Sequence, residues 1–279
     1  MTTIKKIKNI AAVSSGDIFG SAMSAVFWFY LASQIDPISY GEIFWFLGIA
    51  GIFSTIAMFG TINTITVYSA KKIQIQSTLN FISLSASVIL SLIVIVLFPS
   101  FFTIDVGIIL IAYVINTLAI GDLLGRKQYT GYSKYTLVQK GLTLGLGFLF
   151  FYLFGYEAII FALACSYVFY IKRIYSIFRE MKIDFSLVKQ RMGFITNNYF
   201  TFILTGAIGG GQLDKIIVAP LLGFAILGNY SLALQIINLM MIFPSILYKY
   251  LLPEESTGTS NKQVKIFLII FSIFISILG

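Results

Sequence analysis

The sequence predicts an all-α polytopic membrane protein: a two-lobed helical bundle of parallel repeats, with a full six-helix N-terminal lobe and the start of a second lobe. Hydrophobic residues make up 58% of the chain, charged residues 11%, and the mean hydropathy is +0.93. Soluble domains average about 45–50% apolar and about 25% charged residues. The apolar excess falls in long, repeated runs, which is typical of membrane-spanning helices.

The first span is expected at residues 13–33, after a short basic interfacial helix at 2–12. This apolar run is longer than the ~7–15 residues of a signal-peptide core, which favours an uncleaved span over a signal peptide. Because crossing takes about 20 residues, the run 266–279 is too short and counts as an incomplete ninth helix. Further full spans are expected at 40–66, 79–98, 104–124, 136–154, 156–171, 194–218 and 226–248.

The turn between the first two spans contains Asp36-Pro37. Proline fixes its own φ and has no backbone N–H, so Pro37 suits a turn between helices and not their interiors. The sequence 27–60 is therefore expected to form a transmembrane hairpin.

Basic residues alternate from loop to loop, and Lys215 is the exception among the 19. Because Lys and Arg are retained in cytoplasmic loops, the N-terminus is expected to be cytoplasmic. The opposite loops are short and hold Asp36, Glu42, Asp105 and Glu157. The loops assigned to the cytoplasm carry Lys5, Lys6, Lys8, Lys71, Lys72, Arg126, Lys127, Lys134, Lys140, Lys172, Arg173, Arg179, Lys182, Lys189, Arg191, Lys249, Lys262 and Lys265.

The longest of these loops joins the two predicted halves. In residues 172–191, apolar Ile174, Ile177, Phe178 and Met181 recur at helical spacing among basic residues. This pattern favours an amphipathic helix on the inner leaflet, and a solvated basic loop is the alternative. The domains are accordingly an N-terminal lobe at 1–171, a connector at 172–192 and a partial second lobe at 193–279.

An internal repeat supports two halves. A shift of 187 residues places Gly228 on Gly41 and Ala219 on Ala32, so that two helical hairpins overlie each other. Both hairpins are expected to run from inside to outside and back. The halves are therefore predicted to be parallel repeats about an axis normal to the membrane.

The same two hairpins carry a family resemblance. Residues 27–60 show the pattern Leu-Ala, Ile-Asp-Pro and Tyr-Gly, and residues 213–236 show Asp-Lys, Leu-Gly and Gly-x-Tyr. The chain thus resembles the lipid-linked oligosaccharide flippases of the multidrug/oligosaccharidyl-lipid/polysaccharide exporter superfamily. Each half of such a protein has six helices, so the resemblance implies a C-terminally incomplete chain that does not transport alone.

Polar residues within membrane spans are costly and are candidates for function. Asp17 lies in the first helix, where the exporter branch of the resembled superfamily uses an acidic residue for ion coupling; the alternative is an interfacial carboxylate. Gly16 and Gly20 beside it form a face of small residues for helix packing. The aromatic residues of 27–30 and 44–46 indicate an interfacial belt rather than a sugar platform.

The seventh predicted helix contains Gly209, Gly210 and Gly211, followed by Gln212, Asp214 and Lys215. Glycine weakens a helix by nearly 1 kcal/mol relative to alanine. The run is a candidate hinge beside a polar pair that faces a cavity. The alternative is close helix packing with a snorkelling lysine.

Arg126 and Lys127 follow the fourth span at the cytoplasmic face. Guanidinium groups form bidentate contacts with phosphate, so these residues are a candidate vestibule for a pyrophosphate head group. The alternative is the general enrichment of basic residues in cytoplasmic loops. Apart from Lys140, which is counted with the cytoplasmic loops, Lys215 is the single basic residue within the predicted spans, although the resembled flippases often carry several in the cavity.

Composition also limits the chemistry. Histidine is absent and Cys165 is the single cysteine, so no Cys/His metal site or disulfide framework is expected, and no cofactor. The net charge of +8 follows the membrane topology and does not indicate nucleic acid as a partner. No catalytic carboxylate or histidine constellation appears, so the protein is not expected to be an enzyme.

The leading hypothesis is a plasma-membrane flippase that translocates lipid-linked oligosaccharide or polysaccharide precursors by alternating access. The expected partners are the bilayer, the lipid-linked saccharide, and either glycan-assembly proteins or a chain that completes the second lobe. An ion-coupled multidrug-type exporter is the alternative. A membrane-embedded glycosyltransferase, a lipid phosphatase and a non-functional fragment are the remaining readings.

Overall fold

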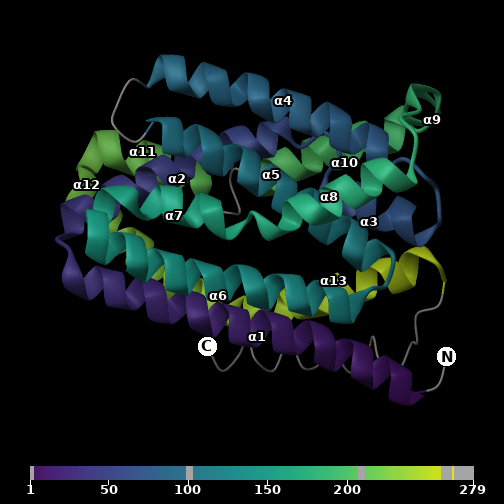
Figure 1. Cartoon of the computed structure of the whole chain (residues 1–279), viewed down its shortest axis with the longest axis horizontal. Coiled ribbons are helices and arrows are strands. Elements are labelled where there is room, and N and C mark those ends of the chain that lie inside the picture. Colours follow the sequence, from purple (N-terminus) through teal and green to yellow (C-terminus); the bar gives the residue numbers. More distant parts are fainter. Residues whose placement is uncertain (1–2, 99–102, 207–210, 259–265, 267–279) are drawn as a thin grey trace.

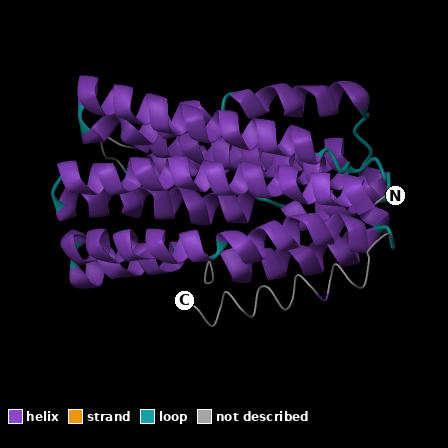
Figure 2. Cartoon of the chain, turned by 90° about the horizontal axis from the view of Figure 1, so that it is seen from below, coloured by secondary structure: helices purple, strands orange, loops and turns teal. Residues whose placement is uncertain are grey.

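The computed structural model describes residues 3–98, 103–206, 211–258 and 266, and every regular element within them is a helix. Most of the helices run side by side along the long axis of the molecule (Figure 1, Figure 2). The elements are α1 (Thr3–Gln34), α2 (Pro37–Ala57), α3 (Ile62–Ala70), α4 (Gln76–Leu97), α5 (Thr103–Gly125), α6 (Tyr129–Phe154), η1 (Tyr156–Ala158), α7 (Ile159–Ser166), α8 (Phe169–Glu180), α9 (Phe185–Gln190), α10 (Met192–Leu204), α11 (Gln212–Leu222), α12 (Phe224–Met240) and α13 (Ile242–Ser256).

Six helical stretches of the described residues are long and apolar enough to cross a membrane. α12 and α13 together would make a seventh, bent by 51° where they meet. These spans confirm the predicted all-α, multi-span membrane class, whereas the division into two lobes stays a prediction. The six are Ile7–Gln34, Pro37–Ala57, Gln76–Leu97, Thr103–Gly125, Tyr129–Phe154 and Tyr156–Glu180.

The predicted second span, 40–66, is wrong in its C-terminal part. α2 ends at Ala57, and α3 starts after Thr61, whose side chain accepts a hydrogen bond from the Thr64 amide at 3.2 Å. Gly60 lies between them against Leu79, and its amide donates to the Ser83 hydroxyl at 3.0 Å. A threonine N-cap starts a new helix wherever its side chain satisfies a free amide, and here it divides the apolar run.

The predicted seventh span, 194–218, is also divided. Its described parts are α10 and α11, neither of which has the length of a span. Gly211 immediately precedes α11 with a φ of +62°, a left-handed conformation that favours glycine. The candidate hinge residues Gly209 and Gly210 lie outside the described residues, as does nearly all of the predicted ninth helix.

Four of the seven aromatic residues assigned to the interfacial belt are instead buried within the protein, while Phe29 is exposed. Phe27, Trp28, Phe44 and Phe46 are buried in a core cluster together with Leu31. Their rings pack edge-on or tilted, with Trp28 and Phe44 centroids 4.7 Å apart. The belt prediction is wrong for these four because aromatic enrichment near a helix end does not indicate which side of the helix faces lipid.

The connector 172–191 is mostly helical, as predicted, and its apolar face packs against protein, whereas its position on the inner leaflet stays a prediction. α8 continues the sixth span, and Ile174 and Ile177 on its apolar face are buried in a second core cluster. Asp184 caps α9, and the hydrogen bond from the Ser186 hydroxyl lowers the pKa of this carboxyl. The Asp184 amide also donates to the Thr78 hydroxyl at 2.8 Å, which ties the connector to α4.

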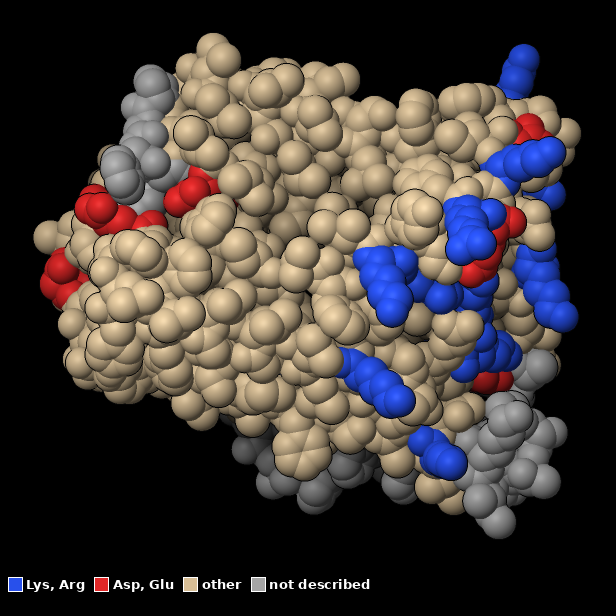
Figure 3. Space-filling view, in the orientation of Figure 1, with Lys and Arg blue, Asp and Glu red and all other residues tan. Residues whose placement is uncertain are grey.

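Charge separates along the long axis. Lys and Arg gather at the end of the molecule where the chain begins, with some acidic side chains among them, whereas the opposite end shows acidic side chains without basic ones (Figure 3). We call these the basic end and the acidic end. The turn between α1 and α2 lies at the acidic end, where Asp36 caps α2 by accepting from the Ile38 and Ser39 amides. The alternation seen in the sequence is thus present in space, and its cytoplasmic orientation stays a prediction.

The two hairpins related by the 187-residue shift touch each other. A Cβ added to Gly41 of α2 would clash with the carbonyl oxygen of Phe224, and one added to Gly228 of α12 would clash with the carbonyl oxygen of Pro37. Phe224 and Pro37 are themselves 187 residues apart. The contact is therefore reciprocal under the shift found in the sequence, as expected for a local two-fold axis between the hairpins. We call it the glycine seam.

Alanine substitution tests the glycine seam. Gly41→Ala and Gly228→Ala should each lower the thermal midpoint in detergent by about 2–10 °C, because overpacking costs ~1–3 kcal/mol. Gly145→Ala in α6 is the matched control, since no atom lies within 4 Å of its added Cβ. Its midpoint should stay the same or rise, because alanine favours a helix over glycine. Equal midpoints for all three variants would contradict the seam.

Candidate functional site

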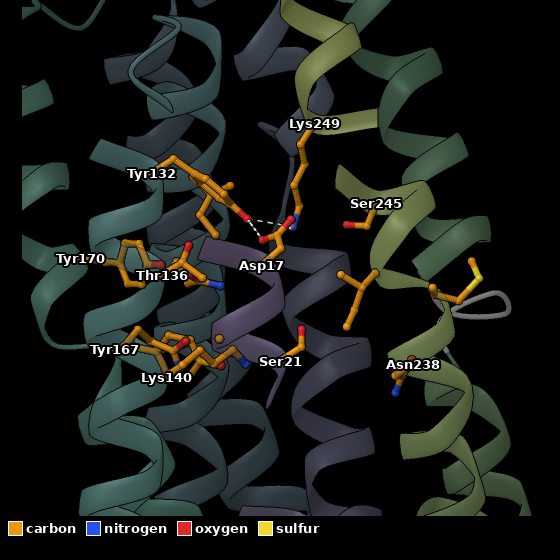
Figure 4. Close-up of a pocket in the computed structure, with 16 residues that line it drawn as sticks. Asp17, Ser21, Tyr132, Thr136, Lys140, Tyr167, Tyr170, Asn238, Ser245 and Lys249 are labelled. Atoms are coloured by element: carbon orange, nitrogen blue, oxygen red, sulfur yellow. Dashed lines mark hydrogen bonds and ion pairs between the residues drawn. The ribbon is translucent and has the colours of Figure 1, made fainter. Parts of the chain in front are cut away.

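A polar cavity of about 360 Å³ lies among α1, α5, α6, the α7–α8 junction, α12 and α13 (Figure 4). Its lining residues from α1, α5 and α6 lie within stretches that qualify as membrane spans. A polar cavity at this depth is the default candidate for function in a membrane protein. Its polar lining comprises Asp17, Ser21, Asn116, Tyr132, Thr136, Gln139, Lys140, Tyr167, Tyr170, Asn238, Ser245 and Lys249.

Asp17 lies at the centre of a three-residue network in this cavity. The Lys249 ammonium lies 3.0 and 2.9 Å from its two carboxylate oxygens, and the Tyr132 hydroxyl donates to the same carboxylate. Lys249 also donates to the Tyr132 hydroxyl at 2.8 Å. Asp17 is only 6% exposed, so it is a buried member of an ion pair, and its depth in the membrane stays a prediction.

The small residues beside Asp17 explain how α1 reaches α6. A Cβ on Gly16 would lie 2.9 Å from the Ser133 Cα, and one on Gly20 would lie 3.1 Å from the Lys140 Cγ. The spacing of four residues puts both glycines on one face, where backbones approach closely. This approach brings Asp17 within reach of Tyr132.

Two lysines of the cavity were predicted to lie in cytoplasmic loops, and this prediction is wrong. α6 begins at Tyr129, so Lys140 lies three turns inside it, and Lys249 lies inside α13. Both side chains line the cavity (Figure 4). No hydrogen bond or ion pair joins Lys140 to another side chain in the part of the chain that the structure describes. The prediction is wrong because basic residues near the end of a span cannot be distinguished from loop residues by sequence pattern.

A second cavity of about 170 Å³ extends toward the acidic end and shares Gln139, Lys140 and Tyr167 with the first. Lys215 and Gln212 of α11 line it. The Lys215 ammonium donates to the Gln212 side-chain oxygen at 3.2 Å and lies 5.5 Å from the centre of the Phe44 ring. Cation–π contacts of this length stabilise a desolvated ammonium.

The predicted polar pair of Asp214 and Lys215 is not formed. Asp214 instead accepts a hydrogen bond of 2.7 Å from the Tyr230 hydroxyl. Lys215 is 9% exposed and does not snorkel, because Gly48 and Gly51 of α2 leave room for Lys215 and Gln212 against the helix. Of the predicted cavity residues, the structure therefore brings Asp17, Gln212 and Lys215 to the cavities, and it does not bring Asp214 there.

Arg126 and Lys127, the predicted head-group vestibule, lie at the basic end and line neither cavity. The Arg126 guanidinium pairs with Asp122 at 2.8 Å and with Glu180 at 2.6 Å. Asp122 is 0% exposed and also binds Arg173 through two nitrogens, at 2.8 and 2.5 Å. Each guanidinium thus has a carboxylate partner within the protein.

Lys127 forms a second link at the basic end. Its ammonium lies 3.0 Å from the carboxylate of Glu254, a buried residue of α13 that also accepts from the Tyr129 hydroxyl. The Tyr129 and Tyr250 rings pack 5.6 Å apart beside this pair. Together with the Asp17–Lys249 pair, these contacts fasten α13 to α1 and α6, and we call them the ionic seam.

Sequence reasoning missed Asp122, Tyr132, Lys140, Lys249 and Glu254. Asp122 precedes Arg126 by four residues, a spacing that places two side chains on one helix face and could have indicated the pair. The partners of Lys249 and Glu254 are more than a hundred residues away, so no local signal exists for them. Among the described residues no group of three His, Cys, Asp or Glu side chains could hold a metal ion.

Fold and cavity together define a multi-span, all-α membrane protein with a lysine-bearing polar cavity. No protein-family model and no curated protein sequence matches the chain. A solved structure of a MOP superfamily transporter from Pyrococcus furiosus resembles it with a TM-score of 0.47 and 14% identity, over 98% of this chain and 74% of that one. Similarity of this degree does not define a function, so the function rests on the cavity itself.

The buried Asp122 pair generates a stability prediction. Removing one partner of a buried ion pair costs ~3–5 kcal/mol, whereas an exposed pair contributes ~0–1 kcal/mol. Asp122→Asn should therefore lower the midpoint of unfolding strongly, and Glu180→Gln, whose side chain is 43% exposed, should change it little. Fluorescence-monitored thermal unfolding in detergent measures both. An Asp122→Asn protein as stable as the Glu180→Gln protein would show that the two arginines do not depend on Asp122.

Proposed function

We propose that the chain belongs to a membrane transporter that moves a lipid-linked oligosaccharide across the bilayer. The observation that carries the proposal is Lys140, a lysine at membrane depth that lines both polar cavities. A cation in this position is expensive and is expected to face an anion or water. Since no described side chain neutralises it, an anionic ligand is the partner that its position favours.

The lining of the cavity suits a saccharide joined to a pyrophosphate. Lys140 and Lys249 supply ammonium groups, which bind phosphate as point charges. Asn116, Gln139 and Asn238 offer amide donors and acceptors for sugar hydroxyl groups. A volume of about 360 Å³ is within the range of small-molecule sites, ~300–1,000 Å³.

Two seams on either side of the cavity favour alternating access. The glycine seam closes α2 on α12 toward the acidic end, and the ionic seam closes α13 on α1 and α6 toward the basic end. Opening one seam while the other stays closed would expose the cavity to one face of the membrane at a time. No covalent bond is made or broken in this process.

The proposal includes the predicted organisation of the chain. The halves would be 1–171 and 193–279, joined by 172–192, with the basic end at the cytoplasmic face of the plasma membrane. The glycine seam supports the pairing of the two halves, because its contacts are related by the repeat. A lipid-linked head group would then move from the basic end toward the acidic end while its lipid chain stays in the bilayer.

An ion-coupled exporter is the second candidate function, and Asp17 is the observation that favours it. Protonation of Asp17 would remove the charge that holds Lys249, and would loosen the ionic seam. A proton gradient would then drive the opening of the basic end. In this alternative Asp17 carries the coupling ion, and in the flippase it fastens the seam.

Lys140→Gln tests the flippase proposal. Hydrogen bonds to charged groups contribute ~1.5–3 kcal/mol, so loss of the ammonium should weaken binding of a polyprenyl-pyrophosphate saccharide by roughly 10–150-fold. Lys134→Gln is the matched control, because Lys134 is exposed on the same helix and lines neither cavity. Isothermal titration in lipid nanodiscs measures both affinities. Equal affinities for the two variants would refute the proposal.

Asp17→Asn separates the two candidate functions. In proteoliposomes, an exporter coupled through Asp17 should lose all transport driven by an imposed pH gradient. A flippase should translocate the polyprenyl-pyrophosphate saccharide without a pH gradient, and Asp17→Asn should alter its rate by weakening the ionic seam. Translocation that needs both a pH gradient and an ionisable residue 17 would favour the exporter.

A further inference from the structure

An apolar groove of about 300 Å³ lies on the outside of the bundle, between α5 and the junction of α7 and α8. Ile108, Ile111 and Ile115 line it from α5, and Val168 and Ile171 line it from the other side. Ala112 and Ala164 at its base are small, which leaves the space open. The helices that form it are membrane spans, so hydrocarbon chains surround the groove.

Among the described residues, the Tyr167 side chain is shared by this groove and the polar interior. Tyr167 lines the groove and also lines both polar cavities. Its ring packs edge-on against Tyr113, with centroids 5.6 Å apart, and Tyr113 lines the second polar cavity. No hydrogen bond joins the Tyr167 hydroxyl to another residue within the described ranges. The side chain is therefore held by packing alone.

The backbone is interrupted at the same residue. α7 ends at Ser166 and α8 begins at Phe169. Across the junction the Tyr167, Val168 and Tyr170 amides bond to carbonyls three residues earlier, at 3.2, 3.1 and 3.0 Å. A short stretch of this tighter pattern inside a long helix often marks a hinge. At this junction the regular α-helical hydrogen bonding is interrupted, and the Tyr167 hydroxyl makes no hydrogen bond to the described residues.

We propose that this groove seats the hydrocarbon chain of an anionic lipid whose head group lies in the polar cavity, and that Tyr167 is the gate between the two. The inference rests on the proposed function and gives the position of the hydrocarbon chain of the transported lipid. In a bilayer the surrounding lipid is as apolar as the groove, so burial alone does not retain a chain. The hydrocarbon chain of the lipid is retained because the lipid head group is bound by Lys140 on the other side of Tyr167.

Photocrosslinking tests the groove in lipid nanodiscs. p-Benzoylphenylalanine replaces Val168 at the groove, which is 57% exposed, or Val96 on α4, which is 77% exposed and lies outside the groove. The probe is a polyprenyl pyrophosphate that carries a tritiated sugar. Crosslinking at 168 should exceed crosslinking at 96 at least fivefold. Tritiated phosphatidylcholine should crosslink equally at both positions.

Two further variants test whether occupancy of the groove depends on the polar cavity. Ile108→Trp fills the groove from its rim, where Ile108 is 40% exposed and tolerates a larger side chain, and it should reduce crosslinking at 168 by at least threefold. Lys140→Gln should reduce it as well, by the same factor as it reduces affinity. Unfolding midpoints of both variants are measured alongside, so that loss of folding is distinguished from loss of the site.

The outcomes separate this inference from the function on which it rests. Lys140-dependent binding of the probe without preference for position 168 over 96 would overturn the groove and leave the flippase proposal intact. Preferential crosslinking at 168 that ignores Lys140→Gln would overturn the proposed function, because a chain would then occupy the groove without its head group in the cavity. A crosslink from 168 to a second copy of the protein would overturn the groove as a lipid site.

Discussion

The buried ion pair between Asp17 and Lys249 is the constraint on which the cavity depends. It joins residues 232 positions apart and fastens α13 to the first helix of the chain. Each charge alone at this depth would be unfavourable by several kcal/mol, and the Tyr132 hydroxyl satisfies further hydrogen-bonding capacity of the pair. Because Lys249 is committed to Asp17, Lys140 stays as a cavity cation with no carboxylate of its own among the described residues.

This ion pair belongs to the ionic seam, whose character is opposite to that of the glycine seam. At the glycine seam, backbones touch without side chains, and at the ionic seam, charged side chains span the gap. The two seams are weakened by different changes. Added side-chain volume separates the closely packed backbones, and a change of charge breaks the ion pairs. A ligand with negative charge in the cavity competes with Asp17 for Lys249, and would thereby weaken the ionic seam. Under the proposed function, binding would thus be linked to opening of one end.

Much of the fold was predictable because hydropathy and charge are properties of the sequence alone. The long apolar runs give the class, and the alternation of basic loops gives the two charged ends. The 187-residue shift aligned Gly41 with Gly228, although nothing in it predicted that the two glycines would touch. The break at Gly60 and Thr61 was missed because hydropathy does not register a helix cap.

The candidate site was less predictable because its residues meet only in three dimensions. Asp17 is a candidate by sequence because a carboxylate within a span is costly and because the resembled exporters use an acidic residue in this helix, and the structure supplies its partners. Lys140 and Lys249 were assigned to loops, since a lysine near a span end is usually cytoplasmic, and both instead line the cavity. Arg126 is a candidate for head-group binding or an ordinary cytoplasmic-loop residue by sequence, and in the structure Asp122, four residues earlier, pairs with it. Whether a basic side chain is neutralised by a carboxylate within the protein depends on the three-dimensional fold, and sequence pattern does not show it.

The central claim is that the two seams open alternately around the Lys140 cavity. Double electron–electron resonance tests it in a Cys165→Ala background with two pairs of spin labels: at Ile38 and Ile226 near the glycine seam, and at Ile7 and Tyr248 near the ionic seam, all on exposed side chains. Saturation with the polyprenyl-pyrophosphate saccharide should shift the two distance distributions in opposite directions. Bound ligand with both distributions unchanged, or with both shifted the same way, would contradict the account.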